Sequence, residues 1–329
     1  MVRAAIVGLG WWGQRLVDAV QGKSKDIQFI KAHTRNREKA DAFCSSRKIA
    51  WAPTLDEILN DAEIDAVAFA TPHSQHAEQV IQAAAAGKHV FVEKPLALTG
   101  DDARRAADAA KATGVVLAVG FNRRFNPSMK LLRDTIREGK LGVISSIMAE
   151  QTAISGLSLA AGNWRADPHE TPGAALTAAG IHPLDGMIEL MGRVKRVYCV
   201  ITRRACQTDD TTNVMLTFEN GVTGQLFCSI AVTPTYRMAA FGTLGIAEIS
   251  HHQMETFKMT SSPAKHGDPM NSTIINTLGV NMLNAELVQF AKSIATKTPF
   301  PTDPEEVVHG AYVFDAIIKS AATGMPVDI

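Results

Sequence analysis

The sequence is poor in the features that mark metal-binding, disulfide-bonded and nucleic-acid-binding proteins. Its 329 residues include four cysteines, which show neither CxxC spacing nor nearby histidine pairs, and the histidines lack the spacing of metal ligands. These absences predict reduced, buried thiols and no metal site. Lysine plus arginine and aspartate plus glutamate both number 33, so the formal net charge is zero. We therefore expect no polyanion-binding surface and no nucleic-acid partner.

Long apolar runs are also missing. None approaches the roughly 18 residues that a membrane span needs. The first predicted strand begins at Val2, which leaves no room for a signal peptide. We therefore expect a cytoplasmic protein with no membrane partner. The length of 329 residues favours two domains of ordinary size.

The first third of the chain alternates strand-like and helix-like patterns. Short apolar runs at residues 27–32, 66–70 and 89–92 are followed by helical patterns at 37–47, 76–86 and 101–113, and a last strand is expected at 115–119. Such alternation predicts an α/β Rossmann domain, a doubly wound parallel sheet with helices on both faces.

Beyond Gly120 the pattern changes. Strand candidates with period-two alternation lie at residues 143–150, 197–203, 212–218 and 222–230, with helices at 175–191 and 304–322. This pattern predicts an α+β domain with a mostly antiparallel sheet, and Asn220-Gly221 predicts a type I′ hairpin turn. We expect domains at 1–122 and 123–329, with the closing helix able to pack back on the first domain.

A glycine motif, Gly8-Leu9-Gly10-Trp11-Trp12-Gly13, directly follows the first apolar run. A strand that turns into a helix there exposes backbone N–H groups and the positive helix end, where a pyrophosphate binds. Gly8 permits the tight turn, Gly10 lets the phosphate approach the backbone, and Gly13 lets helix and strand pack closely. Trp11 and Trp12 are expected to pack against and shield the pyrophosphate. The motif predicts dinucleotide binding, with a purely structural turn as the alternative.

The end of the second strand indicates which dinucleotide is preferred. An NAD-preferring domain normally has an acid about 20 residues past the last glycine, where it binds the ribose 2′-hydroxyl. Thr34 occupies that place and is followed by Arg35 and Arg37. Threonine can donate to a 2′-phosphate, Arg35 can pair with it, and Arg37 adds positive charge. We expect NADP(H) to be preferred and NAD(H) to be accepted. A solvated, basic helix start is the alternative.

Glu93-Lys94-Pro95 follows the strand at 89–92, at the carboxyl edge of the predicted sheet. Open α/β folds bind their ligands at that edge. A lysine held there can exchange a proton with a substrate hydroxyl. The alternative is a strand-end turn with a solvated lysine. The proline fixes the backbone beside the lysine and permits a cis bond.

Five segments resemble, in order and spacing, those of the Gfo/Idh/MocA family, the relatives of glucose-fructose oxidoreductase and inositol dehydrogenase. They are the glycine motif, Thr71-Pro72-His73-Ser74-Gln75-His76, Glu93-Lys94-Pro95, Gly120-Phe121-Asn122-Arg123-Arg124-Phe125 and Gly180-Ile181-His182-Pro183-Leu184-Asp185. The resemblance covers nearly the whole chain. It implies a Rossmann domain and a substrate domain with a large open sheet, through which members usually oligomerise. A homodimer or homotetramer is expected.

The resemblance also implies roles for single residues. The family's catalytic lysine falls on Lys94 and its histidine on His182. The threonine-proline that lines the nicotinamide side falls on Thr71-Pro72. From the same two motifs we add His76 and Glu93 to the expected cofactor contacts.

The chain departs from the family pattern at Ala178. Many sugar and polyol dehydrogenases of the family have aspartate there, four residues before the histidine. Because four residues make one helical turn, the alanine leaves a gap beside His182. Asp185, one turn on the other side, is expected at the substrate site, where it would orient the imidazole. A helix-surface ion pair is the alternative for this aspartate.

Three arginines are candidates for binding the substrate. Arg123 and Arg124 open the second domain, and Arg165 precedes the helix of His182. Guanidinium groups bind planar carboxylates through paired hydrogen bonds, so these residues favour an anionic substrate. Contact with the cofactor phosphate or with a surface acid is the alternative.

Together these features predict an enzyme that interconverts a secondary alcohol and a ketone on a small hydroxylated compound, with or without a carboxylate. Hydride transfer would use a nicotinamide cofactor, with Lys94 as the acid/base group. One alternative is a dihydrodiol dehydrogenase of the same family. Another is an NADP-binding sensor without turnover, which Ala178 favours and which Lys94 and His182 oppose.

Overall fold

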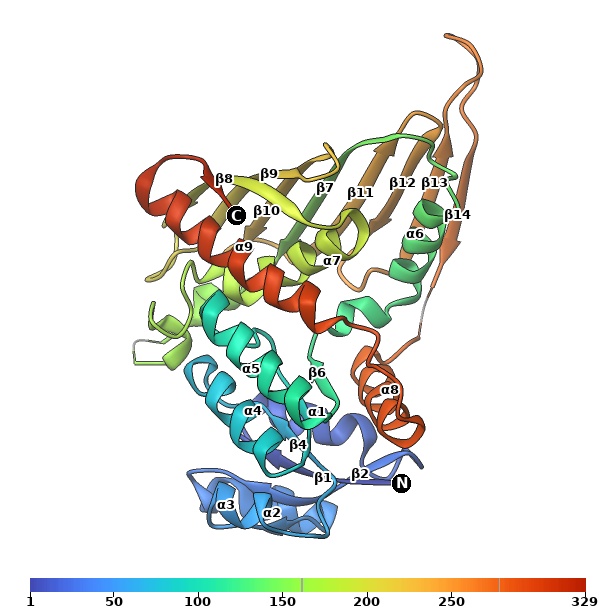
Figure 1. The fold of residues 1–329 in the computed structure, drawn as a ribbon. Coiled ribbons are helices and arrows are strands. Elements are labelled where there is room, and N and C mark those ends of the chain that lie inside the picture. Colours follow the sequence, from blue (N-terminus) through green and yellow to red (C-terminus); the bar gives the residue numbers. More distant parts are fainter. Residues whose placement is uncertain (161, 278) are drawn as a thin grey trace. The chain divides into compact units, whose positions relative to one another are not determined.

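The computed structural model describes residues 1–160, 162–277 and 279–329, without the side chain of Lys39. These residues divide into two units, 1–122 with 281–311 and 123–280 with 312–329 (Figure 1). The arrangement differs from the expected domains because residues 281–311 join the first unit. Helix α8 (Met282–Thr296) packs against α1, β1 and β2, and Asn284 Nδ2 donates to the Ala19 carbonyl at 2.8 Å.

The first unit contains a six-stranded sheet in the order β3-β2-β1-β4-β5-β6, with parallel pairings throughout. Strands such as β4 are buried at every residue, because helices cover both faces and apolar runs fill the space between. This confirms the doubly wound fold. The strands are β1 (Val2–Val7), β2 (Ile27–His33), β3 (Ala50–Trp51), β4 (Ala66–Phe69), β5 (His89–Val92) and β6 (Leu117–Val119). The helices are α1 (Trp11–Val20), α2 (Arg37–Arg47), α3 (Leu55–Leu59), α4 (His76–Ala85), α5 (Gly100–Thr113), α8 and the first part of α9 (Pro304–Thr323).

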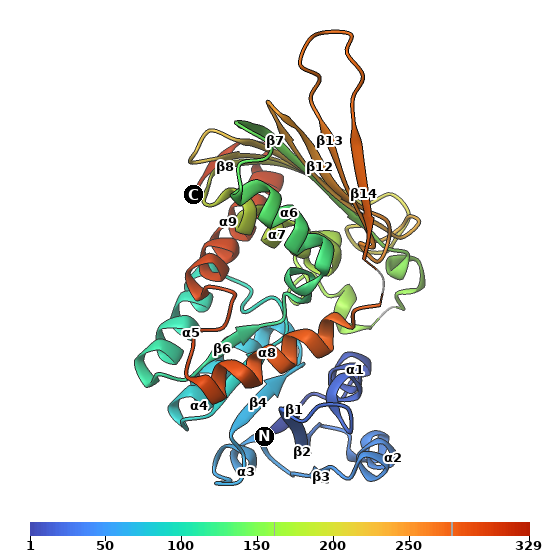
Figure 2. The same cartoon turned by 90° about the vertical axis from the view of Figure 1, so that its right-hand side faces the viewer.

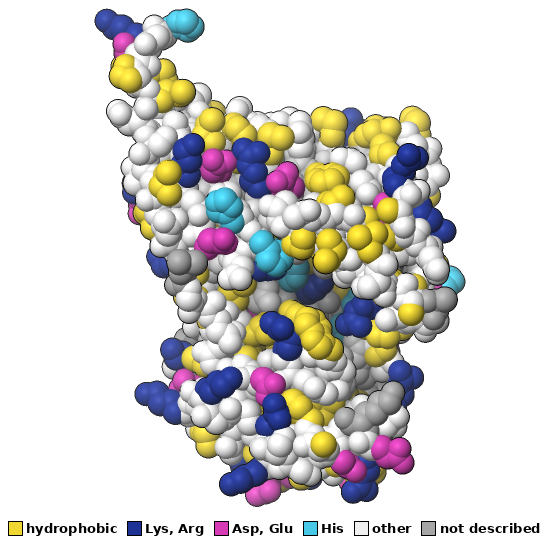
Figure 3. All heavy atoms as spheres, turned by 180° about the vertical axis from the view of Figure 1, so that it is seen from behind, with side chains coloured by type: hydrophobic (Ala, Val, Ile, Leu, Met, Phe, Trp, Pro, Cys, Tyr) yellow, Lys and Arg dark blue, Asp and Glu magenta, His cyan; other side chains and the backbone are white. Residues whose placement is uncertain are grey.

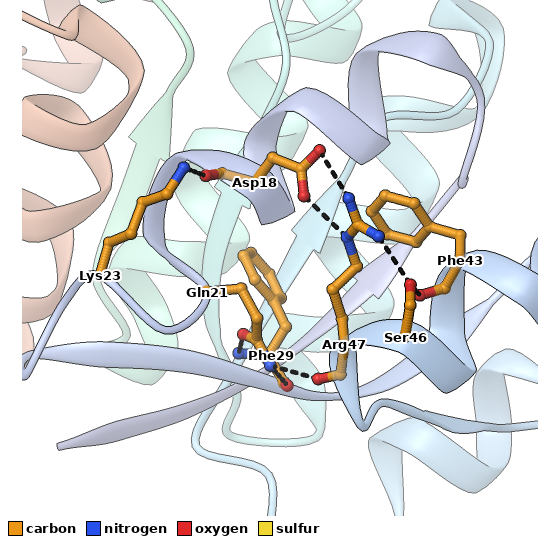
Figure 4. A network of polar contacts seen from close by, with 7 residues as sticks. All are labelled: Asp18, Gln21, Lys23, Phe29, Phe43, Ser46 and Arg47. Carbon is orange, nitrogen blue, oxygen red and sulfur yellow. Dashed lines mark hydrogen bonds and ion pairs between the residues drawn. The ribbon is translucent and has the colours of Figure 1, made fainter.

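A polar network ties α2 to α1 and β2 (Figure 4). Arg47 Nε and Nη2 donate to the two carboxylate oxygens of Asp18 at 2.8 and 3.1 Å. Gln21 Nε2 donates to the carbonyls of Phe29 and Arg47, each at 3.0 Å, and its Oε1 accepts from Phe29 N. These contacts anchor the elements on both sides of residues 34–36, the segment expected to select the cofactor.

The second unit contains a nine-stranded sheet in the order β14-β13-β12-β11-β7-β10-β9-β8-β15. Its pairings are antiparallel apart from the parallel pair β7 and β10, which confirms the mostly antiparallel sheet. The strands are β7 (Ile144–Thr152), β8 (Val194–Thr202), β9 (Thr211–Phe218), β10 (Thr223–Ser229), β11 (Thr235–Gly242), β12 (Gly245–Ser250), β13 (Thr256–Ser261), β14 (Ser272–Asn276) and β15 (Val327–Asp328).

Helices cover one face of this sheet. Figure 2 shows α6 (Pro127–Arg137), α7 (Ile181–Met191) and the end of α9 on the same side, with the β13–β14 hairpin extending past its neighbours. Burial alternates along strands such as β9, because every second side chain points to the helices and the others point to the open face. Figure 3 shows this open face, with hydrophobic and charged side chains interspersed.

The predicted type I′ turn at Asn220-Gly221 is wrong. That turn needs a positive φ at both central residues, whereas Gly221 has a φ of 87° and Asn220 is not among the positive-φ residues. The strands are joined instead through a turn in which Gly221 N donates to Phe218 O at 3.0 Å. The Asn220 side chain is held by Met191 O and Val222 N, which fixes this conformation.

Across the described residues, every helix is too short or too polar to span a lipid bilayer.

Candidate active site

The glycine motif forms a tight turn between β1 and α1. Gly8 has a φ of 95°, and a Cβ there would lie 2.5 Å from the Ala70 carbonyl oxygen. A Cβ at Gly13 would collide with the carbonyl oxygen of Gly8. At Gly10, the residue before α1, a Cβ would meet no described atom within 4 Å. The backbone at Gly10 is therefore open, so this turn fits a pyrophosphate.

The two tryptophans of the motif have different surroundings. Trp11 is 67% exposed, and the Arg15 guanidinium lies 4.9 Å from its ring centroid. Trp12 is half-buried, and its indole interacts with the Glu93 carboxyl, which lowers the pKa of that group. The indole thus connects the glycine turn to the carboxyl end of β5, where Glu93 lies.

Glu93 lies buried between the glycine turn and the next strand. Its exposed fraction is 6%, and a Cβ at Gly120 would lie 3.0 Å from its Oε2. Burial raises the pKa of Glu93 to about 7, a rise that the Trp12 indole and the charge of Lys94 oppose. Its Oε1 is also buried without a hydrogen-bond partner in the described part of the chain. The side chain therefore has an unused polar atom for a ligand.

Lys94 follows Glu93 at the carboxyl end of β5 and is half-buried. The Lys94–Pro95 peptide is cis. Since β1, β4 and β5 are parallel neighbours, Gly8, Thr71 and Lys94 all follow strands at one edge of this sheet. The predicted cofactor motif and the predicted acid/base group thus share the ligand-binding edge of a doubly wound fold.

His76 has a different environment from the expected cofactor contact. Its ring is fully buried, with Nδ1 2.7 Å from the Pro95 carbonyl oxygen and Nε2 3.1 Å from the Thr71 carbonyl oxygen. Thr71 Oγ1 in turn donates to Gln79 Oε1 at 2.6 Å. Both ring nitrogens therefore face backbone of the chain itself. Pro72 is half-buried between these residues.

The two arginines after β2 also differ. Arg35 is exposed, beside the half-buried Thr34. The Arg37 guanidinium lies 4.7 Å from the Trp51 ring centroid, and its Nε is 3.3 Å from Asp41 Oδ1. Arg35 is thus available to a ligand, whereas Arg37 already has partners within the unit.

In the second unit, two expected substrate contacts bind each other instead. Arg124 Nε and Nη2 donate to Asp185 Oδ2 and Oδ1 at 2.8 and 2.7 Å, and both side chains are buried. Glu189 lies 3.8 Å from Arg124 Nη1 and 3.2 Å from Arg133 Nε. We therefore revise the roles of Arg124 and Asp185 from substrate contacts to a buried ion pair. For Asp185, this differs both from orienting the His182 imidazole and from an ion pair at the helix surface.

Among the described residues, no carboxylate pairs with Arg123 in this way. Its Nε is buried without a hydrogen-bond partner among the described residues, and its guanidinium lies 6.0 Å from the Tyr236 ring centroid. The Tyr236 hydroxyl is likewise buried and unpartnered there, and burial raises the pKa of Tyr236 above its usual value. Burial also lowers the pKa of Arg123. No sequence pattern indicates Tyr236, because β11 comes beside Arg123 only in the folded chain.

His182 lies in the first turn of α7 and is 8% exposed. The turn before it, Leu176–Gly180, is a π-helix, a rare conformation that often occurs at functional sites. Within this turn Ala178 is exposed, whereas Thr177 and Ala179 are buried. The position of the missing aspartate therefore faces open space.

Arg165 is the third predicted arginine. It is exposed in a short 3-10 helix, Trp164–Ala166, with its guanidinium 4.2 Å from the Trp164 ring centroid. Partial desolvation lowers the pKa of Arg165.

A doubly wound sheet with a glycine turn, followed by a mostly antiparallel sheet, defines the class of two-domain, dinucleotide-binding proteins. Comparison with family models makes the class specific. Residues 2–121 match a model described as "Oxidoreductase family, NAD-binding Rossmann fold", and residues 129–248 match the "GFO/IDH/MocA C-terminal domain". The chain belongs to the Gfo/Idh/MocA oxidoreductase family.

Individual proteins agree with this assignment. The rhizopine catabolism protein MocA of Rhizobium meliloti is 32% identical, over 75% of this chain and 77% of that protein. Mouse trans-1,2-dihydrobenzene-1,2-diol dehydrogenase is 29% identical, over 69% of this chain and 67% of its own. The structure of levoglucosan dehydrogenase with NADH and levoglucosan superposes with a TM-score of 0.90, at 23% identity, over 100% of this chain and 99% of that one. This last likeness concerns the fold.

Proposed function

We propose that the protein is an NADP(H)-preferring oxidoreductase that interconverts a secondary alcohol and a ketone on a small sugar- or polyol-like compound carrying a carboxylate. The observation that carries this proposal is the position of Lys94, at the same sheet edge as the glycine turn. The names of the two sequence relatives, one a dihydrodiol dehydrogenase and the other a rhizopine catabolism protein, support an alcohol or sugar as the substrate.

In the proposed reaction, the bound nicotinamide supplies the hydride acceptor or donor. Lys94 Nζ accepts the hydroxyl proton during oxidation and returns it during reduction. His182 binds the substrate oxygen. The glycine turn holds the pyrophosphate, and the half-buried Trp12 shields it.

Arg123 supports a carboxylate on the substrate. Arg123 is half-buried, its Nε lacks a hydrogen-bond partner among the described residues, and a carboxylate can accept from its guanidinium. Ala178 adds no negative charge near His182 that would repel such a group. Turnover should therefore be compared within pairs of hydroxy compounds that differ only by a carboxylate or its amide. We expect higher kcat/KM for the acids. Higher kcat/KM for the amides would contradict the proposal that the substrate carries a carboxylate.

Two other functions are separated by a wider panel of polyols, hydroxy acids and dihydrodiols. The mouse relative favours a dihydrodiol dehydrogenase, which would oxidise a cyclic diol in preference to the other compounds. A sensor without turnover would bind the cofactor and convert no compound of the panel. The proposed function requires turnover of hydroxy acids above dihydrodiols.

Cofactor preference gives a first prediction. Arg35→Ala should weaken NADPH binding by about 1.5–3 kcal/mol, the range of a charge-assisted hydrogen bond, or roughly 10- to 150-fold. NADH binding should stay near its weaker wild-type value, since it has no 2′-phosphate. Fluorescence titration with both reduced cofactors measures this. Arg37→Ala is the matched control, and a smaller loss is expected because Arg37 is held by Trp51 and Asp41. Tighter binding of NADH than NADPH by the wild type would contradict the preference.

Association through the open sheet face gives a second prediction. This face holds a shallow depression lined by residues including Met148, Tyr198 and Met215, and Met215 is 57% exposed. Exposed apolar side chains gathered in one depression favour a partner surface. We expect a dimer or tetramer, and Met215→Glu should dissociate it. Met325, 63% exposed and outside this lining, provides the control Met325→Glu. Light scattering that finds a wild-type monomer at micromolar protein would contradict the prediction.

A further inference from the structure

His76 joins the two segments that follow β4 and β5. These strands are parallel neighbours, so the segments leave the sheet side by side. The imidazole lies between them, with Nδ1 2.7 Å from Pro95 O and Nε2 3.1 Å from Thr71 O. His76 is fully buried, so water does not compete for these contacts.

A second residue of α4 strengthens the same link. Gln79, almost one turn after His76, accepts from Thr71 Oγ1 at 2.6 Å. Its own Nε2 donates to Gln75 Oε1 at 3.2 Å, which fixes the orientation of the amide. The start of α4 therefore holds Thr71 by both its carbonyl and its hydroxyl, and holds Pro95 by its carbonyl.

The contact with Pro95 constrains Lys94 closely. The peptide between the two residues is planar, and the proline ring fixes its own φ. Few torsions therefore remain free between the Pro95 carbonyl, which His76 contacts, and the Lys94 Cα. Displacing a reacting group by about 1 Å can cost 100-fold in rate.

We propose that His76 is a positioning residue, which sets the place of the Lys94 side chain relative to the Thr71-Pro72 segment. The imidazole acts through the backbone and does not touch the reacting atoms. A neutral ring donates to one carbonyl, and a doubly protonated ring donates to both. The contact at 2.7 Å marks Pro95 as the main acceptor. The kinetic part of this proposal rests on the proposed function.

The first test compares two substitutions of the same residue. His76→Phe keeps a ring of similar shape and removes both donors, whereas His76→Gln keeps an amide that can donate to a carbonyl. We expect His76→Phe to lower kcat roughly 10- to 100-fold with NADPH binding near the wild-type value, and His76→Gln to recover part of kcat. His89→Phe is the control, because His89 is a half-buried histidine at the other end of β5 whose Nδ1 accepts from Val116 N. An unchanged kcat per folded molecule in His76→Phe would overturn the proposal.

A second measurement does not depend on activity. Amide hydrogen exchange in a peptide spanning 93–97 should be faster in His76→Phe than in the wild type, with residues 50–60 unchanged. Equal exchange in both proteins would overturn the positioning role. If exchange in this peptide is faster in His76→Phe but the wild type turns over no compound, the link between the two segments stands. Only the proposed function would then be rejected.

Discussion

Lys94→Ala is expected to lower kcat by about 10²- to 10⁴-fold, the usual contribution of a general acid or base. Binding of NADPH should remain near the wild-type value, because the glycine turn and Arg35 are untouched. The lysine follows β5 at the ligand-binding edge of the sheet and is half-buried, so its ammonium can reach a ligand without being fully solvated. The expected loss therefore lies in kcat rather than in the dissociation constant.

The controls for this prediction are two lysine variants. Lys94→Met removes the amine and keeps most of the stem, so it should match Lys94→Ala. Lys111→Ala removes an exposed lysine from α5 and should leave kcat unchanged. Steady-state kinetics and fluorescence titration of all three variants provide the comparison. If Lys94→Met turns over at the wild-type rate, Lys94 is not the acid/base group.

Asp185→Asn is expected to lower the free energy of unfolding by about 3–5 kcal/mol, because the buried Arg124 would lose its paired hydrogen bonds and keep only the longer contact of 3.8 Å with Glu189. Both oxygens of Asp185 accept from Arg124, and the side chains of the pair are 7% and 6% exposed. Arg124→Met should be comparably destabilising. Denaturant unfolding of the single and double variants measures the effect.

The double variant distinguishes a buried pair from two independent contacts. Removing both charges leaves no uncompensated partner, so the loss should be smaller than the sum of the two single losses. Arg196 and Asp328 form a paired contact at the surface, at 2.6 and 2.9 Å, and give the control. Asp328→Asn should cost about 1 kcal/mol or less. A similarly small loss for Asp185→Asn would contradict the role given to the buried pair.

The Rossmann part of the fold could be predicted because its signals are local. Apolar runs buried on both faces, glycines at a strand-to-helix turn and amphipathic helices each lie within a few residues. The helix predicted at 37–47 matches α2, and the strand predicted at 89–92 matches β5. The sheet of the second unit was predicted in type and not in extent, because β13 and β14 lack a strong alternation of buried and exposed residues. Helix α6 was missed although its apolar residues recur at helical spacing.

What the sequence could not supply depends on contacts between distant residues. Helix α8 joins the first unit by packing on α1 and β1. No sequence pattern near residue 282 predicts this packing. The pairing of Arg124 with Asp185 uses a guanidinium and a carboxylate that looked equally suited to a ligand. Tyr236 reaches Arg123 only because β11 lies inside the sheet. Electrostatic partners of this kind follow from the fold and not from spacing.

Direct transfer of a labelled hydride tests the central claim. The wild-type protein would be given oxidised NADP and the best hydroxy compound of the panel, deuterated at the carbinol carbon, and the reduced cofactor would be examined by mass spectrometry. The account predicts deuterium in the nicotinamide, formed at a rate that Lys94→Ala lowers by about 10²-fold or more. Tight cofactor binding with no deuterium transferred from any compound of the panel would contradict it.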